Sequence, residues 1–96
     1  MRRNVVITTL REMADRIGIA SAGSEWYLFG SVARDDPRPS DIDLMILCVD
    51  DAQADALRKA IDPEAFSLPI HLCLLRFDEA YEVNAIEVQR AEKIFP

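Results

Sequence analysis

Two short motifs in the first half of the chain combine residue types that bind phosphates and metal ions. The first motif, residues 28–34, reads LFGSVAR and indicates a strand that ends in Gly-Ser where a short helix begins. Such a junction leaves backbone N–H groups free, lets a ligand approach the backbone at Gly30, and offers the Ser31 hydroxyl to an anion. It is not a Walker loop, because no Gly-Lys-Ser/Thr follows. The motif predicts a phosphate site in outline.

The second motif, residues 40–44, reads SDIDL and carries two carboxylates. Asp41 and Asp43 are two apart on a predicted strand, so both point to one face with their Cα atoms about 6.6 Å apart. Carboxylates at this spacing can bracket metal ions, and Mg²⁺ suits them because it takes oxygen ligands and bridges phosphates. Gly-Ser alone is usually a turn, and Asp-x-Asp alone is usually solvated surface. Only nine residues separate Ser31 from Asp41, so together the motifs favour a nucleoside triphosphate site.

Together, the two motifs resemble the signature of the DNA polymerase β-type nucleotidyltransferase superfamily, and most closely its minimal, MNT-type members. The resemblance implies an α/β (α+β) fold, in which a small mixed β-sheet has flanking helices. It also implies an Mg²⁺-dependent transfer of a nucleoside monophosphate, AMP from ATP, to a hydroxyl, with release of pyrophosphate. The residues that it implies are Gly30, Ser31, Arg34 and Ser40 for the nucleotide, and Asp41 and Asp43 for the metal.

This chain departs from the family at the third catalytic carboxylate, which the family carries on the next strand between apolar residues. The matching segment, residues 69–74, reads PIHLCL and holds His71, the only histidine. His71 is open to three interpretations: a catalytic base, a metal ligand although Mg²⁺ prefers oxygen, or a packed polar residue in a degenerate site. Asp78 and Glu79 lie beyond this strand, so neither is expected to replace the carboxylate. The family usually has glycine at the position of Asp35, whose negative charge weakens the case for an enzyme.

The elements expected to position these residues alternate between helix and strand. In chain order they are a helix over 5–17, a strand over 26–29, a short helix from 31, a strand over 41–49, a helix from about 51 that Pro63 stops, a strand over 68–75, and a last helix from about 78. The helix before Pro63 is expected to bury Ala54, Leu57, Ala60 and Ile61. The last helix is expected to place Tyr81, Ala85, Val88 and Phe95 roughly on one side. Strand parity places His71 and Cys73 on one face, with no disulfide to Cys48.

Composition and length limit the function classes. The chain has 96 residues, half of them hydrophobic, and a net charge of −6 from 11 basic and 17 acidic residues. These values predict one domain over 1–96 and make nucleic acid an unsuitable partner, because nucleic-acid binding needs clustered Lys and Arg. No apolar run reaches the length of about 18–20 residues that spans a membrane, and the N-terminus does not resemble a signal peptide. Two cysteines in apolar runs indicate reduced thiols and a cytoplasmic protein.

The length also leaves no room for a substrate-binding domain, so a partner is expected. The chain resembles the MNT half of HEPN–MNT toxin–antitoxin pairs, which implies a small helical HEPN-like partner and AMP transfer to that toxin. The alternative is a catalytically degenerate antitoxin that acts by protein contact, and His71 in place of a carboxylate favours it. A third alternative is a homo-oligomer formed through an unsatisfied face of the small core.

Overall fold

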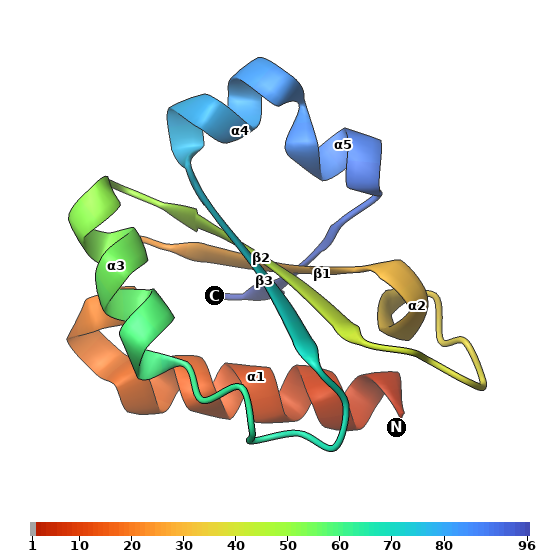
Figure 1. Cartoon of the computed structure of the whole chain (residues 1–96). Helices are drawn as coiled ribbons and strands as arrows, with labels where there is room; N and C mark the ends of the chain where they lie inside the picture. Colours follow the sequence, from red (N-terminus) through yellow and green to blue (C-terminus); the bar gives the residue numbers. More distant parts are fainter. Residues whose placement is uncertain (1) are drawn as a thin grey trace.

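Four strands form one mixed sheet in the computed structural model, which describes residues 2–96 (Figure 1). The strands are β1 (Glu25–Phe29), β2 (Ile42–Cys48), β3 (Ile70–Arg76) and β4 (Glu92–Phe95), and their spatial order is β3-β2-β1-β4. β1 runs antiparallel to both β2 and β4, whereas β2 and β3 are parallel. The expected small mixed sheet with flanking helices is therefore confirmed.

Helices lie on both faces of this sheet (Figure 1). They are α1 (Arg3–Ile17), a 3₁₀ turn (Gly18–Ser21), α2 (Gly30–Ala33), α3 (Asp51–Ala60), α4 (Phe77–Val83) and α5 (Ala85–Gln89). In the described range, 2–96, none of the helices has the length and apolar character needed to cross a membrane.

The main core lies between α1, α3 and one face of the sheet. On α1, Val6, Leu10 and Met13 recur every three to four residues and are buried, as expected for one helical face. They belong to the same apolar cluster as Leu44 and Ile46 of β2, which are fully buried. This packing fixes β2 at the centre of the sheet, so the strand that begins beside Asp41 has a rigid base.

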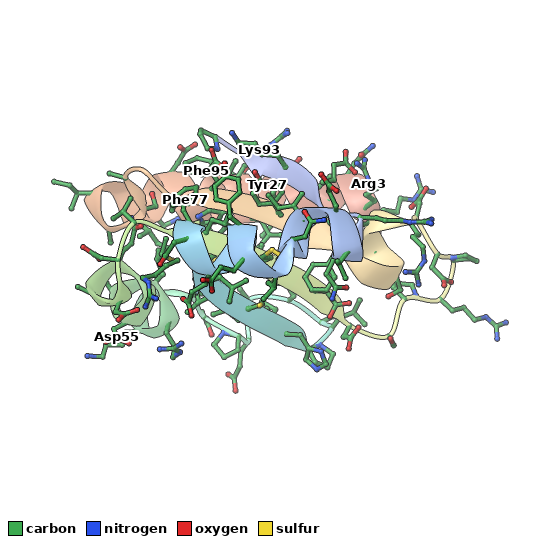
Figure 2. All side chains as sticks on the ribbon, turned by 90° about the horizontal axis from the view of Figure 1, so that it is seen from above. Arg3, Tyr27, Asp55, Phe77, Lys93 and Phe95 are labelled. Carbon is green, nitrogen blue, oxygen red and sulfur yellow. The ribbon has the colours of Figure 1, made fainter. Side chains whose placement is uncertain are left out.

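The opposite face of the sheet carries a smaller apolar cluster under α4 and α5. Met45 and Leu47 of β2 point to this side and pack with Tyr27 of β1. Phe77, at the start of α4, packs against the same cluster, and Figure 2 shows Tyr27 and Phe77 beside this helix. Side chains of β2 therefore alternate between two buried faces, as the sequence predicts for a central strand.

The parallel pairing of β2 with β3 is made by the crossover through α3. Asp50 caps this helix, and its Oδ1 accepts a hydrogen bond from the Gln53 backbone N–H at 2.8 Å. Leu57 and Ile61 are buried as expected, but Ala60 is exposed, which corrects that part of the predicted stripe. Ala54 is half-buried against the same cluster, and Ile61, just after the end of α3, fills the core place next to Leu57 in place of Ala60.

The segment after β3 differs most from expectation, because it is not one helix. Asn84 adopts a left-handed conformation with φ 52° and separates α4 from α5. The last residues form strand β4 beside β1, so Phe95 lies in a strand rather than on a helix. Tyr81 and Val88 are 82% and 69% exposed, and only Ala85 of the predicted helical side is buried.

The two cysteines are free and lie on opposite sides of the sheet. Cys48 is buried in the cluster under α1 and α3, whereas Cys73 packs against the cluster under α4 and α5. The expectation that no disulfide joins them is therefore confirmed.

Candidate functional site

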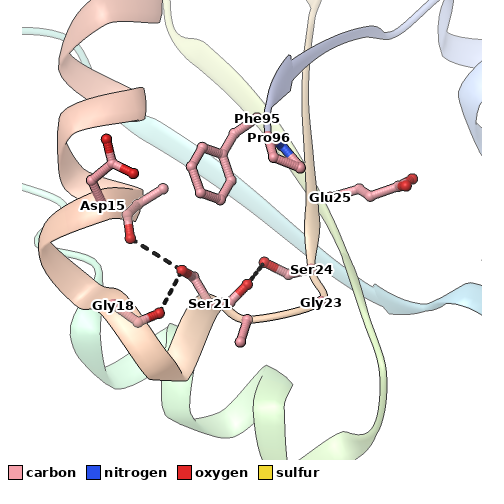
Figure 3. Close-up of a pocket in the computed structure, with 10 residues that line it drawn as sticks. Asp15, Gly18, Ser21, Gly23, Ser24, Glu25, Phe95 and Pro96 are labelled. Carbon is pink, nitrogen blue, oxygen red and sulfur yellow. Dashed lines mark hydrogen bonds between the residues drawn. The ribbon is translucent and has the colours of Figure 1, made fainter.

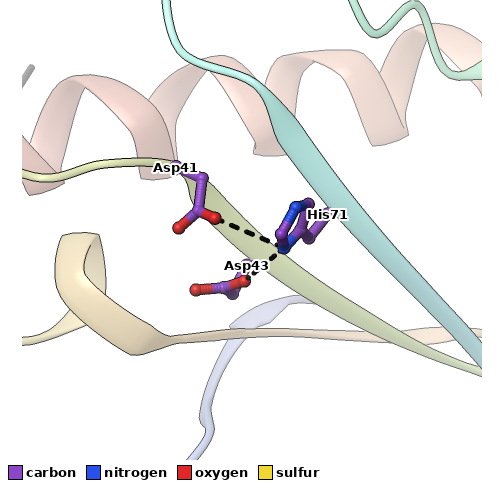
Figure 4. Close-up of side chains that lie close together, drawn as sticks. All are labelled: Asp41, Asp43 and His71. Atoms are coloured by element: carbon purple, nitrogen blue, oxygen red, sulfur yellow. Dashed lines mark ion pairs between the residues drawn. The ribbon is translucent and has the colours of Figure 1, made fainter.

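Three polar side chains meet at the end of the sheet where β2 and β3 begin. They are Asp41, which directly precedes β2, Asp43 of β2 and His71 of β3 (Figure 4). The parallel register places Asp43 beside His71, and the two-residue strand period puts Asp41 on the same face. One ligand atom from each residue lies within 4.8 Å of the other two. In residues 2–96 this is the only group of three or more His, Cys, Asp or Glu side chains with such spacing.

His71 faces both carboxylates through a single ring nitrogen. Its Nδ1 lies 3.3 Å from Asp41 Oδ2 and 3.4 Å from Asp43 Oδ1. The His71 side chain is 68% exposed, whereas those of Asp41 and Asp43 are 24% and 17% exposed. The carboxylates are thus mostly covered, and the imidazole lies on their solvent side; this partly buried place around Asp41 and Asp43 is called the recess below.

Gly30 forms the opposite wall of this recess. It begins α2 with φ +76°, a conformation that side chains with a Cβ rarely adopt. A Cβ added to Gly30 would overlap Asp43 Oδ2. The β1–β2 register explains this approach, because Phe29, the residue before Gly30, is paired with Asp43. Glycine is therefore required here for close approach as well as for its φ angle.

The electrostatics of the recess centre on Asp43. Burial raises the pKa of its carboxyl, and the negative charge of Asp41 raises it further. The positive charge and the hydrogen bond that His71 provides, and the charge of Arg34, lower the pKa of Asp43. Two carboxylates placed this close require compensating positive charge, which a cation or a protonated imidazole can supply.

The other residues that the sequence singled out lie around the recess. Ser31 Oγ donates to the Asp41 backbone oxygen at 3.4 Å, a contact that ties α2 to the start of β2. Ser40 Oγ donates to Asp41 Oδ1 at 3.3 Å. Arg34 is exposed at the end of α2, near enough to act on the charge of Asp43. Ser31 and Ser40 therefore have a structural role as well as the binding role expected of them.

Asp35 occupies a position that suits glycine. It has φ 55°, in the left-handed region. Glycine adopts such angles without steric cost, and Asp tolerates them better than most residues. Asp35 therefore stands at a position whose backbone conformation favours glycine.

Neither the acids that follow β3 nor the hollow at the end of α1 competes with this site. Asp78 and Glu79 lie in the first turn of α4, where both pair with Arg76 at the far end of β3. A hollow of about 460 Å³ near the end of α1 is lined by Ser21 and Ser24, whose hydroxyls donate to backbone oxygens (Figure 3). These hydroxyls are already used within the protein, and no residue of the two motifs lines the hollow.

A comparison with protein families settles the general class of this site. The family model described as "Nucleotidyltransferase domain" matches residues 7–94, which include both motifs and all three clustered side chains. The chain belongs to the nucleotidyltransferase domain family. No match was found among the curated proteins or among the solved structures.

Membership of this family defines the reaction in general terms. Nucleotidyltransferase domains transfer a nucleotidyl group from a nucleoside triphosphate, typically with a divalent metal ion. The family predicted from the sequence is therefore confirmed. Its minimal type and a helical partner stay predictions.

The residues of the recess fit a divalent cation. A metal ion about 2.0–2.2 Å from each ligand holds neighbouring ligand atoms about 3–3.5 Å apart. The 3.3 Å and 3.4 Å separations of His71 Nδ1 from the two carboxylates lie in this range. The ligand atoms available to the cation are two carboxylate oxygens and one imidazole nitrogen, rather than three oxygens.

Sequence reasoning identified the clustered residues but not all of their contacts. Strand parity was enough to place Asp41 and Asp43 on one face, and the resemblance to the family placed His71 beside them. The approach of Gly30 to Asp43 was not predicted, because it depends on the register between β1 and β2. The influence of Arg34 on Asp43 likewise needed the three-dimensional path of α2.

Proposed function

We propose that this nucleotidyltransferase domain moves a nucleoside monophosphate, AMP from ATP, to a hydroxyl, and does so with Mg²⁺ or another divalent cation. The observation that carries the proposal is the pairing of Asp41 and Asp43 in a recess walled by Gly30. Two carboxylates in such a recess suit a cation, and the bare Cα of Gly30 lets the Asp43 carboxylate lie against the start of α2, beside the motif expected to bind phosphate.

Each residue has a role in this proposal. Asp41 and Asp43 hold the cation, which when bound supplies positive charge to the reacting phosphate. Gly30 and Ser31 contact the triphosphate, with Arg34 and Ser40 at its edge. The acceptor oxygen forms a bond to the α-phosphorus, the α–β phosphoanhydride bond breaks, and pyrophosphate leaves. His71 takes the place of the family's third carboxylate, either as a ligand of the cation or as the acceptor of the hydroxyl proton.

The acceptor that we propose is a hydroxyl on a small helical, HEPN-like partner protein in the cytoplasm. Three exposed apolar side chains on α4 and α5 support a protein contact, because Tyr81, Val83 and Val88 are 82%, 62% and 69% exposed. They lie on the helices that cover the same sheet face as the recess.

A second candidate function is neutralisation of the partner by contact alone. His71 favours it, because a protonated imidazole beside both carboxylates would satisfy their charges without any metal. In that case the recess has no catalytic role, and the exposed side chains Tyr81, Val83 and Val88 of α4 and α5 make the contact that neutralises the partner.

Label transfer tests the enzymatic proposal. The domain is incubated with its candidate partner, Mg²⁺ or Mn²⁺, and ATP labelled at the α-phosphate. We expect labelled partner with the wild type and a loss of at least about 100-fold in the Asp41→Asn/Asp43→Asn double variant, since electrostatic stabilisation of this kind contributes about that much. The matched control is Asp55→Asn, which removes an exposed carboxylate on α3 and should transfer normally.

The outcomes separate the two functions. Absence of transfer by the wild type, or equal transfer by the double variant, contradicts the enzymatic proposal. Neutralisation of the partner that survives Asp41→Asn/Asp43→Asn but is lost on Tyr81→Asp supports the contact mechanism instead.

A further inference from the structure

The nitrogen at the third position changes which metal this site should bind. In a site of three carboxylates every protein ligand is an oxygen, which suits Mg²⁺. Here Nδ1 of His71 occupies the third position at 3.3 Å and 3.4 Å from the two carboxylate oxygens. Imidazole nitrogen is a ligand for first-row transition metals and a poor one for Mg²⁺.

We propose that the Asp41–Asp43–His71 site selects a first-row transition-metal dication over Mg²⁺, with His71 Nδ1 as a direct ligand. The inference deepens the proposed function and rests on it only in taking the recess as a cation site. It also decides between the two roles left to His71, because a nitrogen that ligates the metal is not free to accept the hydroxyl proton.

The position of His71 on β3 supports direct ligation. The parallel register with Asp43 fixes its backbone, so the ring need not swing in from a loop to reach the recess. One nitrogen approaches both carboxylates nearly equally, so an ion held by both carboxylates would also lie within reach of that nitrogen. His71 also stands on the solvent side of the two carboxylates, where a cation that they hold would otherwise be coordinated only by water.

The cation selected should be one that accepts both carboxylate oxygen and imidazole nitrogen. First-row dications meet this condition, and their affinities for mixed sites rise from Mn²⁺ towards Cu²⁺. Mn²⁺ has the lowest affinity in that order, so it gives the most demanding test of the preference. If the nitrogen makes the site prefer transition metals, even Mn²⁺ should bind more tightly than Mg²⁺.

Metal binding without nucleotide tests the inference apart from activity. Untagged protein is titrated with Mn²⁺ by electron paramagnetic resonance, Mg²⁺ is added as competitor, and pulsed measurements record coupling of Mn²⁺ to ¹⁴N. His71 is the only histidine, so an imidazole coupling in untagged protein has one source. The key variant is His71→Asp, which supplies a third carboxylate. The side chain is 68% exposed, so this substitution removes no core packing.

We expect ¹⁴N coupling in the wild type that disappears in His71→Asp. The ratio of Mn²⁺ to Mg²⁺ affinity should also fall by about tenfold or more in the variant, since even groups that only support metal ligands contribute about 10–100-fold. The matched control is Cys73→Ser, which changes the next residue along the same face of β3 and should keep both the coupling and the ratio.

Absence of ¹⁴N coupling in the wild type overturns the inference, and so does an unchanged affinity ratio in His71→Asp. Failure of the inference remains distinct from failure of the proposed function. Label transfer with Mg²⁺ in the absence of ¹⁴N coupling leaves the enzyme and removes the metal preference. Conversely, ¹⁴N coupling without label transfer, whether Mg²⁺ or Mn²⁺ is supplied, supports the metal preference and contradicts the enzymatic proposal.

Discussion

At the scale of single residues, Gly30 connects backbone conformation to the candidate site. We predict that Gly30→Ala both destabilises the fold by about 1–3 kcal/mol and abolishes Mn²⁺ binding, because the new Cβ strains a positive φ and displaces the Asp43 carboxylate. Urea denaturation and metal titration measure the two effects. Gly18→Ala is the matched control, since Gly18 also has positive φ (+68°) but no atom within 4 Å of the added Cβ. A stability loss with intact metal binding in Gly18→Ala, and both losses in Gly30→Ala, is the expected pattern. Equal metal binding in the two variants would contradict it.

Tyr27 should make the free energy of unfolding depend on pH in the alkaline range. Burial, and then the hydrogen bond of its hydroxyl to Glu25 Oε1 at 2.8 Å, raise the pKa of Tyr27 from 10.0 to about 12. Below pH 10 the side chain is neutral in both folded and unfolded chains. Between pH 10 and 12 only the unfolded chain releases the proton, so the free energy of unfolding should fall by at most about 3 kcal/mol.

Urea denaturation from pH 8 to pH 12 measures this slope in wild type and Tyr27→Phe. The variant should lose part of the decline, because it has no phenol to ionise. Tyr81→Phe removes an exposed hydroxyl instead and should decline as the wild type does. Identical curves for all three proteins would show that Tyr27 is not the group responsible.

Strand parity was sufficient to predict that Asp41 and Asp43 share a face, because side chains two apart on a strand do so. Placing His71 beside them also needed the resemblance to the family, since it depends on the pairing of β2 with β3. The contact of Gly30 with Asp43 joins residues on different elements. It depends on a register that packing of the whole sheet decides, and no local pattern carries that information.

At the scale of elements, Asn84 divides what the sequence predicts as one helix. Its φ of 52° ends α4, and its side-chain Nδ2 donates to Glu87 Oε2 at 3.1 Å on α5. We predict that Asn84→Ala costs about 1–2 kcal/mol, because alanine tolerates the left-handed conformation less well. Asn84→Gly adopts the same conformation freely and should stay within a few tenths of a kcal/mol of the wild type. Thermal or urea unfolding compares them, and an equal cost in both variants would point to the lost side-chain hydrogen bond instead.

The same segment shows where periodicity fails. Tyr81, Ala85 and Val88 have helical spacing, yet Tyr81 and Val88 are exposed because the axis changes direction at Asn84. β4 is short, and its strand identity comes from pairing with β1, far away in the sequence. Elements with strong local patterns, such as α1 and β2, were predicted closely. Those defined by distant partners were not.

At the scale of the whole molecule, β4 closes the edge of the sheet opposite the site. Its Ile94 is 2% exposed in the main core, and the Ile94 backbone oxygen accepts a hydrogen bond from Arg11 Nε of α1 at 2.6 Å. Phe95 packs edge-on against the fully buried Trp26, with ring centroids 5.9 Å apart. The end of the described chain is thus part of the core that supports β1 and, through it, β2.

The residues that stabilise the far edge of the sheet lie apart from the residues of the candidate metal site. Because the strand order is β3-β2-β1-β4, Ile94 lies at the opposite edge of the sheet from His71. We predict that Ile94→Ala lowers the free energy of unfolding by about 2–5 kcal/mol, the usual cost of such a core cavity. In the fraction that remains folded, the Mn²⁺ to Mg²⁺ affinity ratio should not change. Val88→Ala, at a position 69% exposed, should stay within about 0.5 kcal/mol of the wild type. A changed affinity ratio in Ile94→Ala would mean that the recess is coupled to the far edge through β1, rather than held locally by β2, β3 and Gly30.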